Sequence, residues 1–367
     1  MCGVAAGTNR SLHGQPVRFP LEPLCQISVS SLIPLPCPDV VQTLLRGFDQ
    51  LHDNARGGAI SIGNFDGVHW GHAALVRQLR QTADRLAGPA VVITFDPHPA
   101  ALLRPNAPLP RLTTLERRAE LLARLGVDFV VVCEVTQPFL NLTAQQFFQT
   151  TVQEALQARA VVEGPNFFFG RNREGDIERL REMCAATAIE LHVVQPETRS
   201  PTTLAVASAS PRAAAPPMIS SSRIRTLLAN GDVSTANSLL TAPYQLTGVV
   251  GRGEQRGRGL GFPTANLRHT ATMIPGHGVY ATRVNVNGQT YPAATHLGPN
   301  PTFGGDVDKV EVHILNFNGD LYGRSLSVDF VAHVRDIASF KSIHELKQQL
   351  QRDVALVKTL VANAAPQ

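Results

Sequence analysis

One stretch decides how the first half of the chain folds, and it reads Ala59-Ile-Ser-Ile-Gly-Asn-Phe-Asp-Gly-Val-His-Trp-Gly-His72. Its apolar start is typical of a short strand, and residues 72–86 after it place their apolar side chains on one face of a helix. Strands that alternate with helices of about 10 to 15 residues predict βαβ units and a parallel, doubly wound α/β sheet. The alternation continues with strands expected at 90–95, 128–135, 160–163 and 190–194, and with helices that begin near 113 and 143 or span 176–187.

Two of the expected helices begin with the spacing of a capping box, at Thr113-Thr-Leu-Glu116 and at Thr143-Ala-Gln-Gln146. Residues 1–50 show weak periodicity and scattered prolines, and we expect an N-terminal extension with one short strand and a helix near 40–45. Residues 197–217 are rich in alanine, proline and serine, and such a composition predicts a flexible loop.

From Tyr244 onward the pattern changes to short strands separated by Gly, Asn and Asp turns, of which Val286-Asn-Gly-Gln289 is the plainest hairpin signal. This pattern predicts an antiparallel β-barrel, closed by a helix from Ser342 to about Ala362. The expected strands are 244–250, 279–285, 309–315 and 326–331. The chain is thus divided into an extension at 1–50, an α/β domain at 51–228 and a barrel domain at 229–367.

Composition bounds the class of protein. The chain has 367 residues, 43% of them hydrophobic, and a formal net charge of +4 at pH 7. That charge is too small to indicate a protein that coats nucleic acid, and the sequence has no apolar run long enough for a membrane span. The five cysteines are scattered without a C-x-x-C pair, which favours reduced thiols and a cytoplasmic protein over a disulfide framework or a zinc site.

The turn after the first strand carries candidate chemistry. His69 and His72 stand three apart across a glycine, where a strand of a parallel sheet passes into a helix that favours phosphate at its start. As imidazolium donors they would stabilise charge that develops on phosphate oxygens. The alternative is that His72 caps the helix and His69 is a solvated loop residue.

A second phosphate-type loop precedes the barrel. Residues 251–261 combine five glycines with three arginines, so that backbone amides and guanidinium groups can surround an oxyanion. The alternative is a flexible Arg/Gly segment that contacts RNA. Thr264 and Asn266 follow in Pro263-Thr-Ala-Asn266, and their hydroxyl and amide oxygens suit a hard cation such as Mg²⁺.

The Gly-Asn-Phe-Asp-Gly-Val-His-x-Gly-His segment resembles the signature of nucleotidylyltransferases. It is most similar to the FAD synthetase module of prokaryotic bifunctional riboflavin kinase/FMN adenylyltransferases. Thr94-Phe-Asp-Pro-His-Pro99, Asn166-Phe-Phe-Phe-Gly170 and Ile219-Ser-Ser-Ser-Arg-Ile-Arg225 resemble further motifs of that family, in its order. The resemblance implies a Rossmann-like domain in which His69 and His72 are catalytic. It also implies phosphate or ATP contacts at Gly63, Asn64, Asp66, Gly67, Ser221, Ser222, Arg223 and Arg225, and flavin contacts at Asp96, His98, Asn166, Phe167 and Phe169. Taken singly, each of these motifs also has a structural explanation, as a strand-end turn, a core segment or a helix cap.

Pro263-Thr-Ala-Asn266 resembles the hallmark of riboflavin kinases, and the second half follows that family nearly end to end. The resemblance implies that Thr264 and Asn266 hold Mg²⁺, that Gly253, Gly257, Gly261 and Thr264 contact ATP, and that Glu311 is the catalytic base. A carboxylate in the apolar strand Val310-Glu-Val-His-Ile-Leu315 suits a general base, although strand alternation also permits an outward-facing side chain.

The expected function is therefore phosphorylation of riboflavin to FMN by ATP, followed by transfer of AMP from a second ATP to give FAD. We expect small-molecule partners only, with no nucleic acid and no membrane, in a monomer or weak homo-oligomer. The alternatives are a kinase with an impaired adenylyltransferase half, or a non-catalytic flavin- or RNA-binding regulator. Three departures from the family are the long N-terminal extension, the Ala/Pro insertion before Ser220, and Thr241-Ala-Pro-Tyr244 in place of the usual Gly-Arg-Pro-Tyr.

Overall fold

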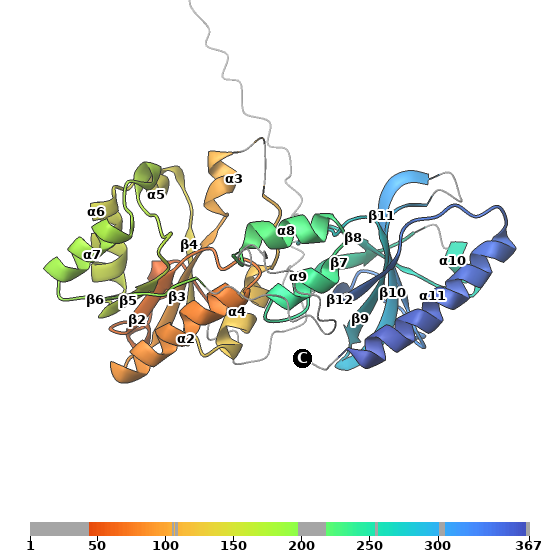
Figure 1. Cartoon of the computed structure of the whole chain (residues 1–367), viewed down its shortest axis with the longest axis horizontal. Coiled ribbons are helices and arrows are strands. Elements are labelled where there is room, and N and C mark those ends of the chain that lie inside the picture. The colour runs from red at the N-terminus through yellow and green to blue at the C-terminus, as the bar shows by residue number, and fades with distance from the viewer. Residues whose placement is uncertain are drawn as a thin grey trace, which may run out of the picture.

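The computed structural model describes residues 44–104, 106, 109–196, 218–253, 256–300 and 305–364. The molecule has an α/β lobe and a β-barrel lobe, with two short helices between them (Figure 1). Most of the expected N-terminal extension and the whole Ala/Pro loop at 197–217 lie outside the described residues. None of the described helices is long and apolar enough to cross a membrane.

The α/β lobe is built on a six-stranded sheet with all of its strand pairs parallel, as predicted. The strand order is β1-β4-β3-β2-β5-β6, so β2 lies between β3 and β5 at the point where the chain changes direction across the sheet. In such sheets ligands bind outside the carboxyl ends of the strands at that point. The strands are Leu44–Arg46 (β1), Ala59–Ile62 (β2), Ala90–Asp96 (β3), Phe129–Glu134 (β4), Ala160–Glu163 (β5) and Glu190–Val193 (β6).

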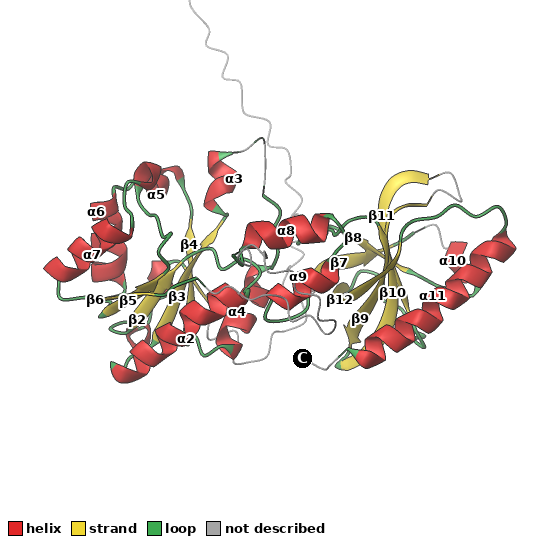
Figure 2. Ribbon diagram, in the orientation of Figure 1, coloured by secondary structure: helices red, strands yellow, loops and turns green. Residues whose placement is uncertain are grey.

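Helices cover both faces of this sheet (Figure 2). Valine or isoleucine side chains of every central strand are buried beneath these helices. These strands are mostly apolar because both faces of the sheet are covered. The helices are Trp70–Arg85 (α2), Pro99–Leu103 (α3), Leu115–Arg124 (α4), Gln137–Leu140 (α5), Ala144–Phe147 (α6) and Ile177–Ala186 (α7), with a π-helix at Phe148–Ala155 and short 3₁₀ turns at 48–50, 53–55 and 171–173.

Two local predictions are wrong. Leu44 and Leu45 belong to β1 and not to a helix, because this apolar segment pairs in parallel with the exposed edge of β4. The cap of α4 is Thr114, whose Oγ1 accepts a hydrogen bond from the Arg117 amide at 3.1 Å, and not Thr113, one residue earlier. The capping box that begins at Thr143 is confirmed.

The second lobe is a closed six-stranded antiparallel barrel in the order β10-β11-β8-β7-β12-β9, as predicted in kind. The sequence pattern missed β8, which is short, and β10, which contains two prolines and a glycine. The helix α11 (Ile343–Asn363) packs against the outside of β9, β10 and β12. The strands are Gln245–Gly251 (β7), Ala265–Arg268 (β8), Gly278–Val286 (β9), Gln289–Asn300 (β10), Gly305–Ile314 (β11) and Ser325–Arg335 (β12), and the short helix Arg256–Leu260 (α10) precedes β8.

The helices α8 (Ser221–Ala229) and α9 (Val233–Leu239) lie between the lobes (Figure 1). Their apolar faces belong to the hydrophobic core of the barrel, where Ile224 and Leu228 are completely buried. Leu112, from the α/β lobe, is part of the same core. The division of the chain at 228/229 stays a prediction; it falls in the last turn of α8, which shares one core with α9 and the barrel.

Candidate active sites

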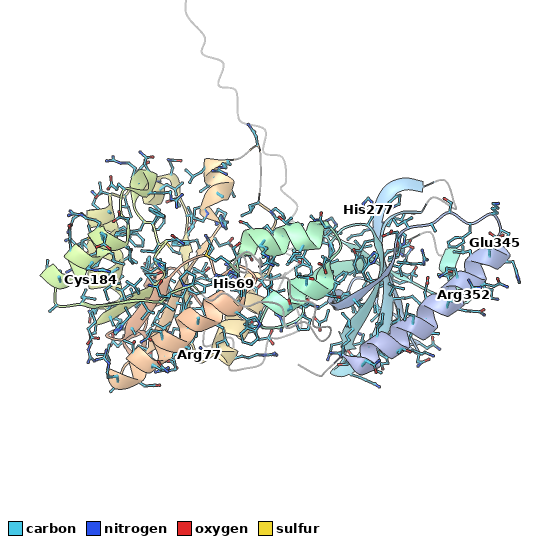
Figure 3. All side chains as sticks on the ribbon, in the orientation of Figure 1. His69, Arg77, Cys184, His277, Glu345 and Arg352 are labelled. Carbon is cyan, nitrogen blue, oxygen red and sulfur yellow. The ribbon has the colours of Figure 1, made fainter. Side chains whose placement is uncertain are left out.

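The loop from β2 to α2, residues 63–69, turns tightly at the carboxyl edge of the sheet. At Gly67 the backbone φ is 87°, and a Cβ there would lie 2.9 Å from Leu112, so glycine alone fits. The loop ends at His69, whose Nδ1 accepts a hydrogen bond from the backbone amide of His72 at 3.3 Å and thereby caps α2. Figure 3 shows His69 at the end of α2 that lies toward the helices between the lobes.

The two histidine rings stack, with their centroids 3.6 Å apart and their planes within 15°. Gly71 permits this stack, because a Cβ at that position would lie 3.1 Å from the His69 ring. Burial lowers the pKa of His69 from 6.5 to about 4. Burial, with the nearby charges of His69 and Arg118, lowers the pKa of His72 well below its ordinary value. Burial thus disfavours the charged form of both rings, which is opposite in direction to the predicted imidazolium groups. Each neutral ring has one N–H, which can still donate to a phosphate oxygen.

A cavity of about 230 Å³ opens beside these histidines, at the ends of β5 and β6. It brings together His69, His72, Asn166 and Phe167, as the sequence predicts. Within the described residues, Nδ1 of His72 is buried and has no hydrogen-bond partner, so a ligand can satisfy it. The remaining lining residues are Gly71, Leu75, Glu163, Gly164, Pro165, Val194, Gln195, Pro196, Met218 and Ile219.

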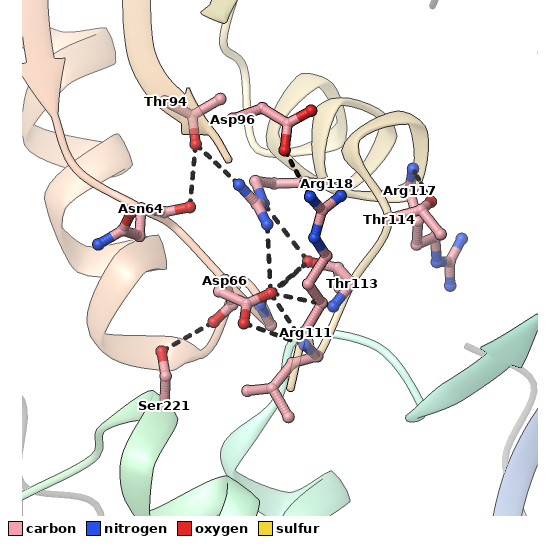
Figure 4. Close-up of polar contacts among 12 residues, drawn as sticks. Asn64, Asp66, Thr94, Asp96, Arg111, Thr113, Thr114, Arg117, Arg118 and Ser221 are labelled. Carbon is pink, nitrogen blue, oxygen red and sulfur yellow. Dashed lines mark hydrogen bonds and ion pairs between the residues drawn. The ribbon is translucent and has the colours of Figure 1, made fainter. Parts of the chain in front are cut away.

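Asp66 anchors the loop and not a substrate (Figure 4). Its carboxylate, 3% exposed, accepts hydrogen bonds from the backbone amides of Leu112 and Thr113, each at 3.0 Å. It also forms ion pairs with Arg118, at 3.2 Å, and with Arg225 of α8. A buried carboxylate with four such partners is satisfied internally. The structure thus gives Asp66 and Arg225 a structural role in holding the loop, and their contact with phosphate stays a prediction.

The start of α8 lies against the same loop. Ser220 caps the helix by accepting a hydrogen bond from the Arg223 amide at 3.3 Å. The Ser221 hydroxyl donates to the backbone oxygen of Asp66 at 2.8 Å (Figure 4), and Ser222 beside it is exposed. The segment that begins at Ser220 therefore lies against the β2–α2 loop.

Gly63 and Asn64 begin the loop. The Gly63 amide extends the pairing between β2 and β3 by donating to the Ile93 oxygen at 3.0 Å. The backbone oxygen of Asn64 accepts a hydrogen bond from the Thr94 hydroxyl at 3.0 Å, and its side-chain Oδ1 is buried without a partner among the described residues. Asn64 is therefore placed to bind a ligand group, whereas Gly63 is committed to the sheet.

The five predicted flavin residues do not lie together. Asp96 and His98 line a separate, nearly closed hollow, where Asp96 pairs with Arg111 at 2.6 Å and His98 caps α3 by accepting from the Ala100 amide. Phe169, 7% exposed, packs in the core of the α/β lobe. The structure thus favours the structural explanation for Phe169 and leaves Asn166 and Phe167 at the larger cavity.

The barrel has a cavity of about 590 Å³ at one end. Thr264, which precedes β8, lines it together with Ala265, and Val312 of β11 lies opposite Ala265 in the strand register. The other lining residues are Val250, Arg258, Pro263, Ile314, Phe317, Asn318, Gly319, Asp320, Leu321 and Tyr322.

Asn266 and Glu311 lie directly opposite each other across β8 and β11. Because strand side chains alternate, they occupy the other face from Ala265 and Val312, and both are partly buried. Glu311 is therefore an outward-facing residue of β11. Asn266 of β8 is its register partner on one side of the strand, and His296 of β10 is its partner on the other.

Glycine is required around this pair of residues. A Cβ at Gly253 would lie 2.3 Å from the Asn266 side chain, and one at Gly257 would lie 2.4 Å from the Phe262 oxygen. Gly261 has a φ of 87°. The glycines thus let the backbone pass close to Asn266 and Thr264, as a phosphate-binding flap requires.

Sequence reasoning missed two residues at the α/β site. Glu163 ends the buried strand β5 and lines the cavity, and its signal was a lone acid after Ala160-Val-Val162. Thr241 donates its hydroxyl to the Val68 oxygen at 2.6 Å. No sequence signal marked Thr241 beyond its departure from the family pattern.

Comparisons with known proteins match both halves of the chain to described families. Residues 51–207 match the family model described as FAD synthetase, and residues 240–361 match the one described as riboflavin kinase. A bifunctional riboflavin kinase/FMN adenylyltransferase of Pseudomonas fluorescens is 33% identical over 331 residues, which cover 88% of this chain and 99% of that protein. The Haemophilus influenzae protein of the same description is 34% identical and covers 86% of this chain and 98% of its own length.

A solved structure has the same fold. The crystal structure of a Streptococcus pneumoniae protein, described as a macrolide-efflux protein, superposes with a TM-score of 0.75 at 30% identity. The match covers 88% of this chain and 99% of that one. The two-lobe arrangement therefore exists in an experimental structure of similar sequence.

Proposed function

The chain belongs to the family of bifunctional riboflavin kinases/FMN adenylyltransferases, and from this premise we propose how its two sites carry out the two reactions. The enzyme is a transferase that uses ATP to phosphorylate riboflavin to FMN, and then ATP again to convert FMN to FAD and pyrophosphate. The observation that carries this conclusion is the coexistence of both family domains in one chain, aligned over nearly the full length of bifunctional relatives.

In the barrel, we assign the general base to Glu311. Its carboxylate would take the proton of the riboflavin 5′-hydroxyl as that oxygen attacks the γ-phosphorus of ATP and the bond to ADP breaks. The glycines at 253, 257 and 261 would let backbone amides approach the phosphates, and the Thr264 hydroxyl would bind one of them. Asn266 lies opposite Glu311 in the strand register, and Thr264 stands two residues before Asn266. The proposed base therefore lies on the outer face of its strand, beside the flap glycines, and not among the residues that line the barrel cavity.

Thr264 and Asn266 also fit Mg²⁺. They offer neutral hard oxygen donors, and Mg²⁺ at kinase sites is held by few protein ligands together with substrate phosphates. No cluster of three or more acidic, histidine or cysteine side chains suited to a metal occurs in the described part of the chain, so a cation here depends on ATP. When bound, Mg²⁺ neutralises charge on the transferring phosphate. Chelation should therefore abolish both activities and added Mg²⁺ restore them.

In the α/β lobe, we assign the triphosphate to the start of α2 and α8. The N–H groups of His69 and His72 and the side chains of Ser222 and Arg223 would receive the phosphates as an FMN phosphate oxygen attacks the α-phosphorus of ATP. The bond from that phosphorus to the β-phosphate oxygen then breaks, and pyrophosphate leaves. Asn64, with its buried unpaired Oδ1, faces the same region of the loop.

We place the flavin of FMN at the mouth of the α/β cavity. Asn166 is exposed and Phe167 partly exposed there, so an aromatic ring system can stack on Phe167 and leave the interior to the nucleotide. Asp96 and His98, held by Arg111 and by the α3 cap, would support the neighbouring strand end and not contact substrate.

We propose a cytoplasmic enzyme, monomeric or weakly self-associating, with small-molecule partners only and with neither nucleic acid nor membrane among them. The described cysteines, Cys133 and Cys184, are free buried thiols, which supports a reducing compartment.

The test separates the two reactions in one protein. Wild type supplied with riboflavin, ATP and Mg²⁺ should form FMN and then FAD. Glu311→Gln should lose FMN formation by about 10²-fold or more while it still converts added FMN to FAD. His72→Asn should lose the conversion of FMN to FAD while it still forms FMN from riboflavin. A wild type that stops at FMN would indicate an impaired adenylyltransferase half, and an unchanged rate in Glu311→Gln would exclude the assigned base and leave the regulator as the alternative.

A further inference from the structure

Glu163 is a buried acid in the wall of the α/β cavity to which the proposed reaction gives no role. It is the last residue of β5 and is 3% exposed. Its Oε1 accepts a hydrogen bond from the backbone amide of Ile62, the last residue of β2, at 2.6 Å. Register pairing between the two strands reaches only Ile60 and Val161, so this side chain bridges the strands where they separate.

The bridge occupies one oxygen of the carboxyl group. Among the described residues, the hydrogen bond to Ile62 uses Oε1 of Glu163, and Oε2 has no hydrogen-bond partner. Burial raises the pKa of Glu163 well above its ordinary value, against the opposite effects of the Ile62 amide and the Ser61 hydroxyl. The other titratable groups that line this cavity are His69 and His72, and both are neutral. No cation of the cavity wall therefore holds the carboxyl group ionised.

The rest of the cavity suits a flat aromatic base. Leu75, Pro165 and Val194 contribute apolar walls, with Pro196 and Met218 near them. The volume of about 230 Å³ exceeds that of a purine, and His69 and His72 lie at the side where a triphosphate would leave. Binding sites of this kind fix orientation through a few polar groups in an apolar pocket.

We propose that Glu163 selects the base of the nucleotide, by holding Ile62 with one carboxyl oxygen and donating an O–H from the other to a ring nitrogen of adenine. This rests on the proposed assignment of the cavity to ATP. Adenine offers ring nitrogens that accept hydrogen bonds, whereas guanine presents a donor at N1. A protonated acid that meets N1 therefore distinguishes the two bases, and an ionised one there would favour guanine; at N3 or N7, which accept in both purines, it would not discriminate.

The experiment uses the full-length enzyme and its single tryptophan, Trp70, which is the first residue of α2 beside His69. Quenching of Trp70 reports nucleotide binding at this site, although ATP also binds the barrel. Titrations with ATP, GTP and 1-deaza-, 3-deaza- and 7-deaza-ATP give dissociation constants for wild type, Glu163→Gln and Glu163→Leu. Glutamine keeps an acceptor for Ile62 and an N–H₂ donor, whereas leucine keeps neither.

For wild type and Glu163→Gln, we expect one of the three deaza analogues to bind about five- to tenfold more weakly than ATP. For Glu163→Leu, we expect that analogue and ATP to bind with equal affinity. A purely structural role would weaken all nucleotides by the same factor in Glu163→Leu, and that result would overturn the inference. So would equal binding of ATP and all three analogues by wild type. If ATP leaves Trp70 unchanged and FMN is not adenylylated by wild type, the proposed site fails first. FMN formation by the barrel shows that each variant is folded.

Discussion

His69 couples the stability of the α/β lobe to pH. Burial lowers its pKa to about 4 in the folded protein, against about 6.5 in an unfolded chain. Above pH 6.5 the ring is neutral in both states, and stability is complete. Between pH 6.5 and 4 the unfolded chain binds a proton that the folded state excludes, so stability falls with pH. At pH 5 this single group should cost about 2 kcal/mol of unfolding free energy.

Urea unfolding followed by Trp70 fluorescence measures this effect at pH 7.5 and pH 5. Wild type should lose more unfolding free energy on acidification than His69→Gln, by about 2 kcal/mol, because glutamine does not titrate. His52→Gln, at an exposed position of the same lobe, should behave like wild type. Equal losses in wild type and His69→Gln would show that His69 is protonated in the folded state.

At the scale of single residues, the sequence indicated which side chains carry chemistry better than it indicated their environment. His69, His72, Asn166 and Phe167 do share one cavity. Their charge state depends on burial by segments distant in sequence, and no local pattern shows that. Asp66 illustrates the same limit, because its partners Arg118 and Arg225 lie 52 and 159 residues away.

The first turn of α2 depends on Gly71. A Cβ at this position would lie 3.1 Å from the His69 ring, so the ring would have to shift by a few tenths of an ångström relative to His72. We expect Gly71→Ala to lower FAD formation from FMN by about tenfold or more while FMN formation stays at the wild-type rate, because misplaced transition-state donors are costly. Gln81→Ala, on the exposed face of the same helix, should change neither rate. Unchanged FAD formation in Gly71→Ala would mean that the stacked pair is dispensable.

At the scale of elements, strong periodicity was enough where packing and sequence agree. Strand β5 and helix α11 begin and end within a residue or so of expectation, because their apolar patterns match their burial. The sequence pattern did not predict strand β10 because Pro292 and Pro299 are unfavourable in strands. It did not predict the edge strand β1 because a segment of three residues is extended only when it pairs with β4. Tertiary pairing decided both cases.

At the scale of the molecule, α8 joins the two active lobes. Its first turn donates from Ser221 to the β2–α2 loop, and its Arg225 pairs with Asp66. Ile224 and Leu228, which follow the same face of the helix at positions i+3 and i+7 from Ser221, are buried in the barrel core. Thr241, after α9, bonds the same loop at Val68. The proposed phosphate side of the adenylyltransferase site thus lies on elements that also pack against the barrel.

This arrangement predicts how the barrel behaves on its own. A fragment of residues 218–367 retains α8 and α9, whereas one of residues 244–367 lacks seven side chains that are buried in the barrel core. These are Ile219, Ile224, Leu228, Val233, Ala236, Leu239 and Leu240. Losing that burial should cost on the order of 5 kcal/mol or more. The shorter fragment should therefore melt about 15 °C or more below the longer one, or fail to fold.

Thermal unfolding by circular dichroism, with FMN formation as the measure of a native barrel, compares the two fragments directly. The longer one should keep kinase activity, because every residue proposed for that site lies within it. Equal melting temperatures would mean that α8 and α9 depend energetically on the α/β lobe alone. A lower melting temperature of the shorter fragment would instead show that α8 and α9 stabilise the barrel as well as contacting the α/β lobe. In that case a substitution in the barrel core beneath Ile224 should change FAD formation through α8, without contact with either nucleotide.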